Sequence, residues 1–352
     1  MVNFILKGRK EVAKALHIRI KKLPLCQNKQ QTMINGHGDD LYQYDKVQMN
    51  FSSNICQHAD LEALKAHLAS RLSLIGNYPE PEAWSLERMI ACQEGIPAEC
   101  VIATSGATEA IYLTAQAFRY HYDLPWPTFS EYADALKMFP PQCERTGLWL
   151  CNPNNPTGDV FDNSYIADAA QRHDLIVIDQ SYEDYTDSPL LSVREAVKMG
   201  KVIQLHSLTK AYGIPGLRLG YITAAAPLTE QIRRYLRPWA VNALAIEAGK
   251  FLLKHGAKLT PDLQESKRLA QMLRRIGQIT VGNSHTNFML CEIYSHTAAE
   301  LKDYLVKKHG ILIRDASNFK GLTPHHFRIA AQTPAENEAL VAAIQSFIIN
   351  EE

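Results

Sequence analysis

The stretch SLTKAYGIPGLRLG, residues 207–220, contains a serine, a threonine, one lysine, one arginine and three glycines. It follows the apolar run Val202–Leu205, which is typical of a strand. Hydroxyl and guanidinium groups suit phosphate oxygens, so this stretch could surround a phosphate. Lys210 taken by itself is equally compatible with an ordinary surface lysine. The interpretation therefore depends on what the rest of the chain places beside it.

Short apolar runs recur along the chain at intervals that suit strands separated by helices. They are Val101–Ala103, Leu148–Cys151, Leu175–Ile178, Val202–Leu205 and Leu219–Thr223. Leucines and one isoleucine at spacings of three and four residues predict an amphipathic helix over 61–75. Alternating strands and helices indicate an α/β fold with a mainly parallel sheet.

The C-terminal part of the chain has a different pattern, in which helices and strands follow one another as in an α+β unit. Its expected elements are a helix at Leu263–Ile276, a strand at Asn287–Ile293, a helix at Ala298–His309, strands at Gly310–Arg314 and Phe327–Ala330, and a helix at Pro334–Ile348. This pattern predicts a second, smaller domain.

Three further polar segments follow predicted strands, at the edge where open α/β sheets bind ligands. Residues 104–109, TSGATE, are typical either of an ordinary turn or of an anion site at a helix N-terminus. Residues 152–158, NPNNPTG, predict a rigid turn, which would also hold an asparagine amide in place. Asp179 is either a helix N-cap or a carboxylate that faces a cationic ring nitrogen, with the phenol of Tyr182 nearby.

The order of SGATEA, PTFSEY, NPNNPTG, DQSY and SLTKAYGIPGLR resembles the fold type I pyridoxal-phosphate enzymes of aminotransferase class I/II, from about residue 35 to the C-terminus. Within this class, the chain resembles the branch of histidinol-phosphate aminotransferase and threonine-phosphate decarboxylase. Four segments resemble the decarboxylase side more: His37-Gly38, Asn50–Ile55, Arg237–Ala245 and Ile313–Phe319. The chain departs from that side at Asp39 and at residues 56–58.

The resemblance implies a PLP-dependent transferase fold of type I. Its large domain would hold a mainly parallel sheet of the seven-stranded type, and its small domain would be α+β. We expect a basic leader at 1–32, an N-terminal segment at 33–58 joining the small domain, a large PLP-binding domain at 59–245 and a small C-terminal domain at 246–352.

The resemblance also implies roles for individual residues around pyridoxal 5'-phosphate. Lys210 would form the internal aldimine and move the proton, with Asp179 on the pyridinium nitrogen. Asn155 and Tyr182 would hold the ring hydroxyl oxygen, and Phe129 would stack on the ring. The cofactor phosphate would be bound by Gly106, Ala107, Thr108, Ser207, Thr209 and Arg218, with Tyr78 reaching the phosphate in the partner subunit. The substrate would be bound by Asn54, Arg314 and Arg328.

These roles imply a PLP-dependent aminotransferase acting on a small phosphorylated amino acid or amine. The alternative is an L-threonine O-3-phosphate decarboxylase of cobalamin side-chain synthesis. The same residues suit both reactions, because the bond at Cα that stands perpendicular to the cofactor ring is the one that breaks, and its orientation selects the reaction. A more remote alternative is a non-catalytic PLP-binding sensor module. The family pattern implies a homodimer with shared active sites.

Composition limits the remaining possibilities. The 352 residues carry 37 basic and 37 acidic side chains, a net charge of zero, which argues against a general nucleic-acid binder. Eight of the basic residues lie within 1–32. No apolar run is long enough to suggest a membrane span. Seven cysteines without a C-x-x-C pair favour a reducing, cytoplasmic location, and no histidine spacing predicts a metal site.

Overall fold

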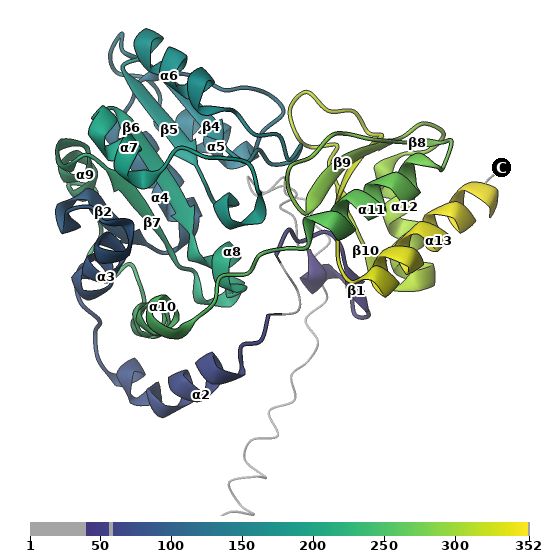
Figure 1. The fold of residues 1–352 in the computed structure, drawn as a ribbon, viewed down its shortest axis with the longest axis horizontal. Helices are drawn as coiled ribbons and strands as arrows, with labels where there is room; N and C mark the ends of the chain where they lie inside the picture. Colours follow the sequence, from purple (N-terminus) through teal and green to yellow (C-terminus); the bar gives the residue numbers. More distant parts are fainter. Residues whose placement is uncertain (1–39, 56–58, 351–352) are drawn as a thin grey trace, which may run out of the picture. The chain divides into compact units, whose positions relative to one another are not determined.

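The computed structural model describes residues 40–55 and 59–350 (Figure 1). The predicted leader at 1–32, the His37-Gly38 motif, Asp39 and residues 56–58 lie outside the described residues. Within the described part of the chain, no helix is both long and apolar enough to cross a bilayer.

A six-stranded sheet organises the first part of the chain, with the order β2-β7-β6-β5-β4-β3. Its strands are β2 (Val101–Thr104), β3 (His121–Asp123), β4 (Thr146–Cys151), β5 (Leu175–Asp179), β6 (Val202–Ser207) and β7 (Gly220–Ala224). Strands β3 to β6 are parallel, while β7 is antiparallel to both of its neighbours. The α/β class is thus confirmed, but the described sheet has six strands instead of seven and is mixed.

Helices cover both faces of this sheet (Figure 1). Their bounds are α2 (Glu62–Ser70), α3 (Trp84–Glu94), α4 (Gly106–Ala117), α5 (Ser130–Met138), α6 (Asn163–Arg172), α7 (Val193–Met199), α8 (Leu208–Tyr212), α9 (Ala226–Arg233) and α10 (Ala243–His255). Alternate strand residues face opposite cores, because successive side chains of a strand point to opposite faces. Val177 packs with α4, α5 and α9, whereas Ile176 and Ile178 pack with α6 and α7.

The predicted helix over 61–75 is only partly right. Helix α2 ends at Ser70, and residues Leu72–Gly76 form a 3-10 helix. Leu64 is buried, but Leu72 is 52% exposed and Ile75 is 72% exposed. The tighter 3-10 turn changes the direction of the later side chains, so the apolar positions do not share one buried face.

A second, smaller core lies in the C-terminal part. An antiparallel sheet of order β11-β12-β9-β8 packs with helices α11, α12 and α13. The bounds are α11 (Leu263–Arg274), β8 (Ile279–Val281), β9 (Phe288–Ile293), α12 (Ala298–Tyr304), β10 (Ile311–Leu312), β11 (Arg314–Asp315), β12 (His326–Ala330) and α13 (Pro334–Asn350). The predicted strand at 310–314 is split, because β10 pairs with β1 (Met49–Asn50) and β11 pairs with β12. After α12 the chain continues as a π-helical turn, Leu305–His309.

The segment around β1 belongs to this smaller core. Phe51 is fully buried within it, its amide donates to the carbonyl of Leu312, and its carbonyl accepts from the amide of Ala330. The domain boundaries stay predictions. The boundary expected between residues 245 and 246 falls inside α10, whose apolar residues pack with α3 beside the larger sheet.

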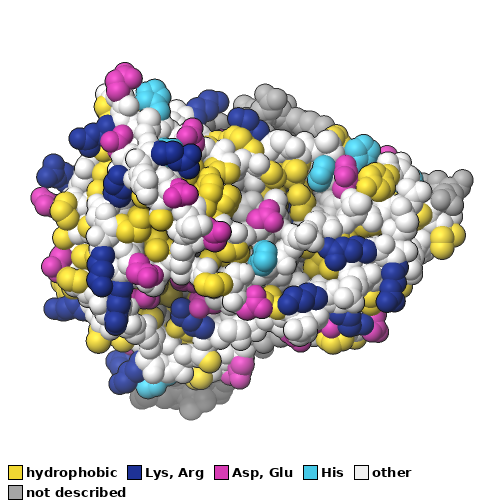
Figure 2. All heavy atoms as spheres, turned by 45° about the horizontal axis from the view of Figure 1, so that its top comes forward, with side chains coloured by type: hydrophobic (Ala, Val, Ile, Leu, Met, Phe, Trp, Pro, Cys, Tyr) yellow, Lys and Arg dark blue, Asp and Glu magenta, His cyan; other side chains and the backbone are white. Residues whose placement is uncertain are grey.

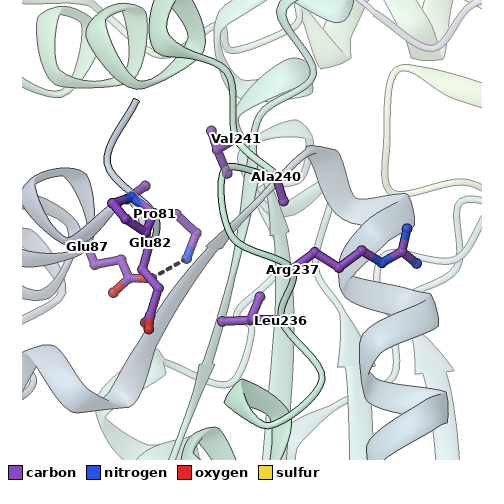
Figure 3. A pocket seen from close by; sticks show the side chains of 9 residues that line it. Pro81, Glu82, Glu87, Leu236, Arg237, Ala240 and Val241 are labelled. Atoms are coloured by element: carbon purple, nitrogen blue, oxygen red, sulfur yellow. Dashed lines mark hydrogen bonds between the residues drawn. The ribbon is translucent and has the colours of Figure 1, made fainter. Parts of the chain in front are cut away.

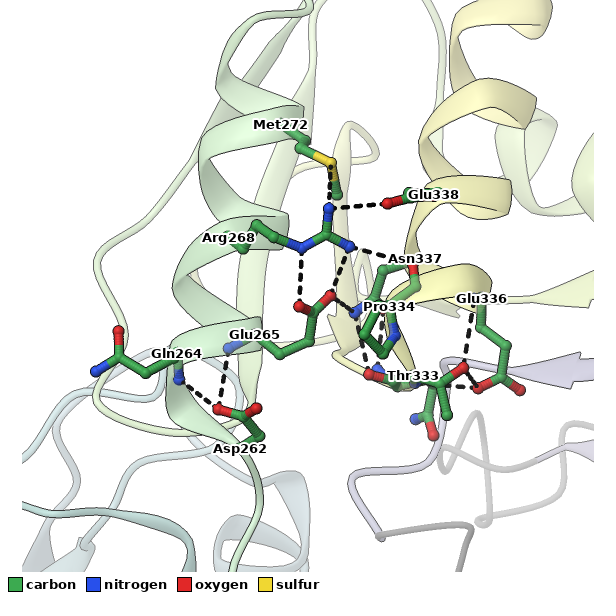
Figure 4. Close-up of polar contacts among 11 residues, drawn as sticks. Asp262, Gln264, Glu265, Arg268, Met272, Thr333, Pro334, Glu336, Asn337 and Glu338 are labelled. Carbon is green, nitrogen blue, oxygen red and sulfur yellow. Dashed lines mark hydrogen bonds and ion pairs between the residues drawn. The ribbon is translucent and has the colours of Figure 1, made fainter.

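A polar network joins α11 to the start of α13 (Figure 4). Arg268 donates two hydrogen bonds to Glu265, of 2.8 and 2.9 Å, and one of 3.0 Å to Glu338. The fully buried Asn337 donates to Glu265 over 2.7 Å. Buried polar groups need such partners, so this network fixes the relative position of the two helices.

Candidate active site

Most of the predicted site residues lie at strand ends, as expected. Asp179 is the last residue of β5, Ser207 is the last residue of β6, and Gly106 begins α4 directly after β2. The carboxyl ends of parallel strands meet at one edge of a sheet, and this edge is where open α/β sheets bind ligands. Asp179 does not cap a helix, which removes the alternative that its position first allowed.

Lys210 lies in the short helix α8, which ends at Gly213 in the left-handed conformation. Its side chain is half-buried, and its Nζ lies 5.7 Å from the ring centroid of Tyr182. Its carbonyl accepts a hydrogen bond of 2.9 Å from the hydroxyl of Tyr185. The backbone that carries Lys210 is therefore tied to the segment that carries Tyr182.

Asp179 is 3% exposed and is held from two sides. The hydroxyl of Tyr132 donates to Oδ2 over 2.8 Å, and the amide of Ser181 donates to Oδ1 over 2.9 Å. Burial raises the pKa of Asp179, and these hydrogen bonds together with the charge of His206 offset part of that rise. Tyr132 was not predicted as a site residue. The available signal was its place in PTFSEY, three residues after Phe129.

A cradle for an anion forms where α4 begins. Gly106 has φ +80°, and a Cβ atom there would lie 2.6 Å from Nη2 of Arg218. A Cβ atom at Gly220 would lie 2.9 Å from the amide nitrogen of Ala107. Both glycines therefore let backbone and guanidinium approach closely. Among the described residues, the buried hydroxyl of Thr209 has no hydrogen-bond partner, and such a group calls for a ligand acceptor.

The remaining cofactor residues are placed differently. Ser207 is buried and lies opposite Gly220 in the β6–β7 register, whereas Thr108 is exposed on α4. The ring of Phe129 meets Tyr132 edge-on, with centroids 5.7 Å apart. Tyr78 is 82% exposed and its ring lies 4.9 Å from that of Trp239, so its contacts do not join it to the cradle within this chain.

Two hydrogen bonds join predicted substrate residues to predicted cofactor residues, and a third holds Arg328 against the backbone. Arg328 donates to the side-chain oxygen of Asn155, and over 2.7 Å to the carbonyl of Ser52. The amide of Asn54 donates to the hydroxyl of Tyr182 over 3.2 Å. Burial raises the pKa of Tyr182 to about 12, against the opposing effects of Arg328 and Asn54. Residues from both cores thus form one site.

Two buried arginines face each other at this site. Arg314 and Arg328 are directly opposite in the β11–β12 register, and they are 7% and 4% exposed. The pKa of Arg328 is lowered to about 10, chiefly by burial and also by the charge of Arg314, against the raising effect of Tyr182. Burial also lowers the pKa of Arg314, which donates to Asn318 over 2.7 Å. Like charges opposite each other are destabilising, so this pair is suited to binding anions.

A separate small pocket lies beside β2 and does not include any predicted site residue (Figure 3). Its buried Glu87 accepts from the amide of Ala103 over 2.9 Å and pairs with Arg233 at 2.9 Å. Arg237 points away from the two glutamates of the pocket wall. The polar groups of this pocket therefore stabilise the fold.

A family model described as aminotransferase class I and II matches residues 127–344, more than half of the chain. The chain belongs to this family. A putative threonine-phosphate decarboxylase of Caldanaerobacter subterraneus is 31% identical over 352 aligned residues, covering 88% of this chain and 93% of the relative. A histidinol-phosphate aminotransferase of the same organism is 27% identical and covers 77% of this chain and 84% of the relative.

The comparison of structures agrees with that of sequences. The crystal structure of L-threonine-O-3-phosphate decarboxylase from Porphyromonas gingivalis matches with a TM-score of 0.81 and 36% identity, over 85% of this chain and 99% of the other. The predicted family and the fold type are therefore confirmed, as is the expectation of an enzyme. The family is PLP-dependent, which also confirms the predicted cofactor.

The residues present fit pyridoxal 5'-phosphate. The partnerless hydroxyl of Thr209, the close approach of Arg218 to Gly106 and the N-terminus of α4 suit its phosphate. The buried carboxylate of Asp179 suits a protonated ring nitrogen. The individual roles of these residues remain proposals.

Proposed function

We propose that this enzyme decarboxylates a small phosphorylated amino acid, L-threonine O-3-phosphate. The observation that carries the proposal is the buried pair Arg314 and Arg328, directly opposite each other in β11 and β12. A substrate with a carboxylate at one end and a phosphate at the other would neutralise both guanidinium groups. Arginine binds either anion bidentately, so each would also fix the orientation of one end.

The names of the relatives favour decarboxylation over transamination. The structure comparison supports this most, with 36% identity and a TM-score of 0.81 for a decarboxylase against 23% and 0.75 for a histidinol-phosphate aminotransferase. In the sequence comparison the two groups overlap, at 31% and 28% for decarboxylases and 30% and 27% for histidinol-phosphate aminotransferases. Transamination of histidinol phosphate stays the second candidate, because these aminotransferases also align over most of the chain. Family membership favours either enzyme over a non-catalytic sensor module.

Each of the chain's own groups then has a task. Arg328 binds the substrate carboxylate and thereby orients the bond from Cα to that carboxylate, while Arg314 binds the phosphate. When bound, pyridoxal 5'-phosphate supplies an electron sink for the electron pair left at Cα. Asp179 would pair through its carboxylate with the ring nitrogen of the cofactor. Carbon dioxide leaves, and the Lys210 ammonium delivers the replacing proton to Cα.

The test compares two substrates on the same cofactor-loaded protein, with products identified by mass spectrometry. We expect L-threonine O-3-phosphate to lose carbon dioxide and to give 1-amino-2-propanol phosphate. Histidinol phosphate with 2-oxoglutarate is expected to give no glutamate. Glutamate from the second reaction alone would replace decarboxylation by transamination, and the absence of both products would overturn both candidates.

We also propose a homodimer whose sites are completed by the partner. Leu72, Ile75 and Tyr78 lie within seven residues of one another and are 52%, 72% and 82% exposed, and Trp239, which contacts Tyr78, is 46% exposed. A cluster of apolar side chains of this kind is typical of a protein interface. A second copy of this chain would bury it and bring Tyr78 to the neighbouring site.

We expect the wild-type enzyme to sediment as a dimer and Ile75→Asp to sediment as a monomer with reduced activity, because the new charge would be buried at the interface. Ile349→Asp is the matched control, because Ile349 is also 72% exposed and lies on α13. Mixing Tyr78→Ala with Lys210→Ala should restore activity through one intact site per mixed dimer. A monomeric wild-type enzyme with full turnover would contradict the proposal.

A further inference from the structure

Arg328 is a buried cation, 4% exposed, and within residues 40–55 and 59–350 no acidic side chain forms an ion pair with it. Buried charges usually have a partner of opposite charge. By contrast, acidic and basic side chains are interspersed on the face of the molecule shown in Figure 2, so that face offers no comparable excess of one charge. Groups without a charge must therefore hold the guanidinium of Arg328 in place.

Neutral groups from three parts of the chain contact this guanidinium. Nη1 donates to the side-chain oxygen of Asn155, in the loop after β4, and Nη2 donates over 2.7 Å to the carbonyl of Ser52, after β1. The ring centroid of Phe288, on β9, lies 5.9 Å from the central carbon of the guanidinium. Each terminal nitrogen carries two protons, so one proton on each is left for a ligand. Because neither oxygen is ionised, Arg328 is oriented without losing its charge to the protein.

The carbonyl of Ser52 is directed by the side chain of Asn50. Oδ1 of Asn50 accepts from the amide of Ser52 over 3.0 Å and from its hydroxyl over 2.7 Å. A backbone amide only donates, so the atom that faces it must be the oxygen of Asn50 and not the nitrogen. An asparagine that binds the backbone two residues ahead is typical of a turn. Asn50 and Ser52 are 7% and 0% exposed, so water does not replace these bonds.

The residue between these two is held separately. The amide of Phe51 donates to the carbonyl of Leu312 over 2.8 Å, and its carbonyl accepts from the amide of Ala330 over 2.9 Å. These bonds hold residue 51, whereas Asn50 receives both hydrogen bonds that Ser52 itself donates among the described residues. With the amide and the hydroxyl of Ser52 fixed, the remaining group on its Cα, the carbonyl, has a fixed direction as well.

We propose that Asn50 is a positioning residue, which directs the carbonyl of Ser52 and through it orients Arg328 toward a carboxylate ligand. The other oxygen that holds the guanidinium belongs to Asn155, which the family pattern places at the ring hydroxyl of the cofactor. The turn at Asn50 therefore helps to set the direction from which the carboxylate is bound relative to the cofactor. This role of Asn50 rests on the proposed role of Arg328, but the contacts that carry it do not.

The first test reads the orientation of Arg328 without substrate. Valine and threonine have nearly the same shape, but only threonine has an oxygen that can accept from the amide of Ser52. In crystal structures of the cofactor-loaded variants, Asn50→Val should lose the hydrogen bond from Nη2 of Arg328 to the carbonyl of Ser52, and Asn50→Thr should keep it. An Asn50→Val structure in which this hydrogen bond is unchanged overturns the proposal.

The second test measures ligand binding by calorimetry. We expect Asn50→Val to bind L-threonine, which has a carboxylate and no phosphate, about tenfold more weakly, the effect of about one hydrogen bond to a charged group. Asn50→Thr should recover most of this loss. 1-Amino-2-propanol phosphate, which has no carboxylate, should bind almost unchanged to both variants. Equal losses for both ligands, or equal binding by the valine and threonine variants, would indicate a packing role and reject the proposal.

A milder variant keeps the proposal testable if Asn50→Val does not fold. Ser52→Ala keeps the backbone bond to Asn50 and loses only that of the hydroxyl, so it should weaken the binding of L-threonine selectively, but less than Asn50→Val. Unchanged binding of L-threonine in Ser52→Ala would then count against the proposal. If the wild-type enzyme binds neither ligand, the proposed function fails, and the crystal structures alone decide the role of Asn50.

Discussion

Replacing Lys210 by alanine should remove the visible absorbance band of the lysine-bound cofactor and lower the turnover of L-threonine O-3-phosphate by about 10⁴-fold or more. Lys210 is the half-buried amine beside Tyr182, and in the sequence it stands between Ser207 and Thr209 on one side and Arg218 on the other. No other group has been assigned both the covalent attachment and the proton at Cα. Spectra and single-turnover product formation on the same sample measure the two losses separately.

Lys258 provides the matched control for this substitution. It lies close to α8, because the amide of the next residue, Leu259, donates to the carbonyl of Ala211 over 2.7 Å. Its own ammonium pairs with Asp184. Lys258→Ala should therefore keep the absorbance band and the main part of the activity. A Lys210→Ala enzyme that retained the band would show that another amine holds the cofactor, and the proposed site would be wrong.

The sequence predicted those parts of the fold that depend on local pattern. Buried parallel strands are nearly continuous apolar runs, and for this reason Leu175–Ile178 and Val202–Leu205 could be located within the observed β5 and β6. The antiparallel direction of β7 could not be predicted, because an apolar run carries no information about strand direction. The apolar spacing at Leu72 and Ile75 likewise could not distinguish burial in the chain's own core from exposure.

The residues of the candidate site were likewise predictable only where a local sequence motif contains them. Asp179, Asn155 and Lys210 stand in motifs that can be read from neighbouring letters. Tyr132 and His206 were missed. The hydrogen bond of Tyr132 to Asp179 depends on a helix packed against the sheet, and the contacts of His206 with Glu183 and Thr223 depend on how the strands pair. Such contacts join residues far apart in sequence. A histidine in an apolar strand therefore gave no sign that it meets Glu183 and Thr223.

The effects of replacing the two arginines should differ according to the end of the substrate that each arginine binds. We expect Arg328→Met and Arg314→Met each to raise the KM for L-threonine O-3-phosphate by about 10²- to 10³-fold, since each leaves one buried anion without its partner. Cofactor binding should persist in both, because the assigned phosphate cradle contains neither residue. The absorbance band provides that control.

Two ligands that each carry one anionic group make the assignment sharper. L-Threonine has the carboxylate alone, and 1-amino-2-propanol phosphate has the phosphate alone. Arg328→Met should lose affinity for L-threonine and keep it for the phosphate compound, and Arg314→Met should do the reverse. Equal losses for both ligands in both variants would mean that the arginines act as one undivided positive site, and the assignment of substrate ends would fail. If instead each variant loses affinity for only one of the two ligands, then Arg314 and Arg328 bind two separate anionic groups. The proposed substrate, with a carboxylate at one end and a phosphate at the other, requires such a pair.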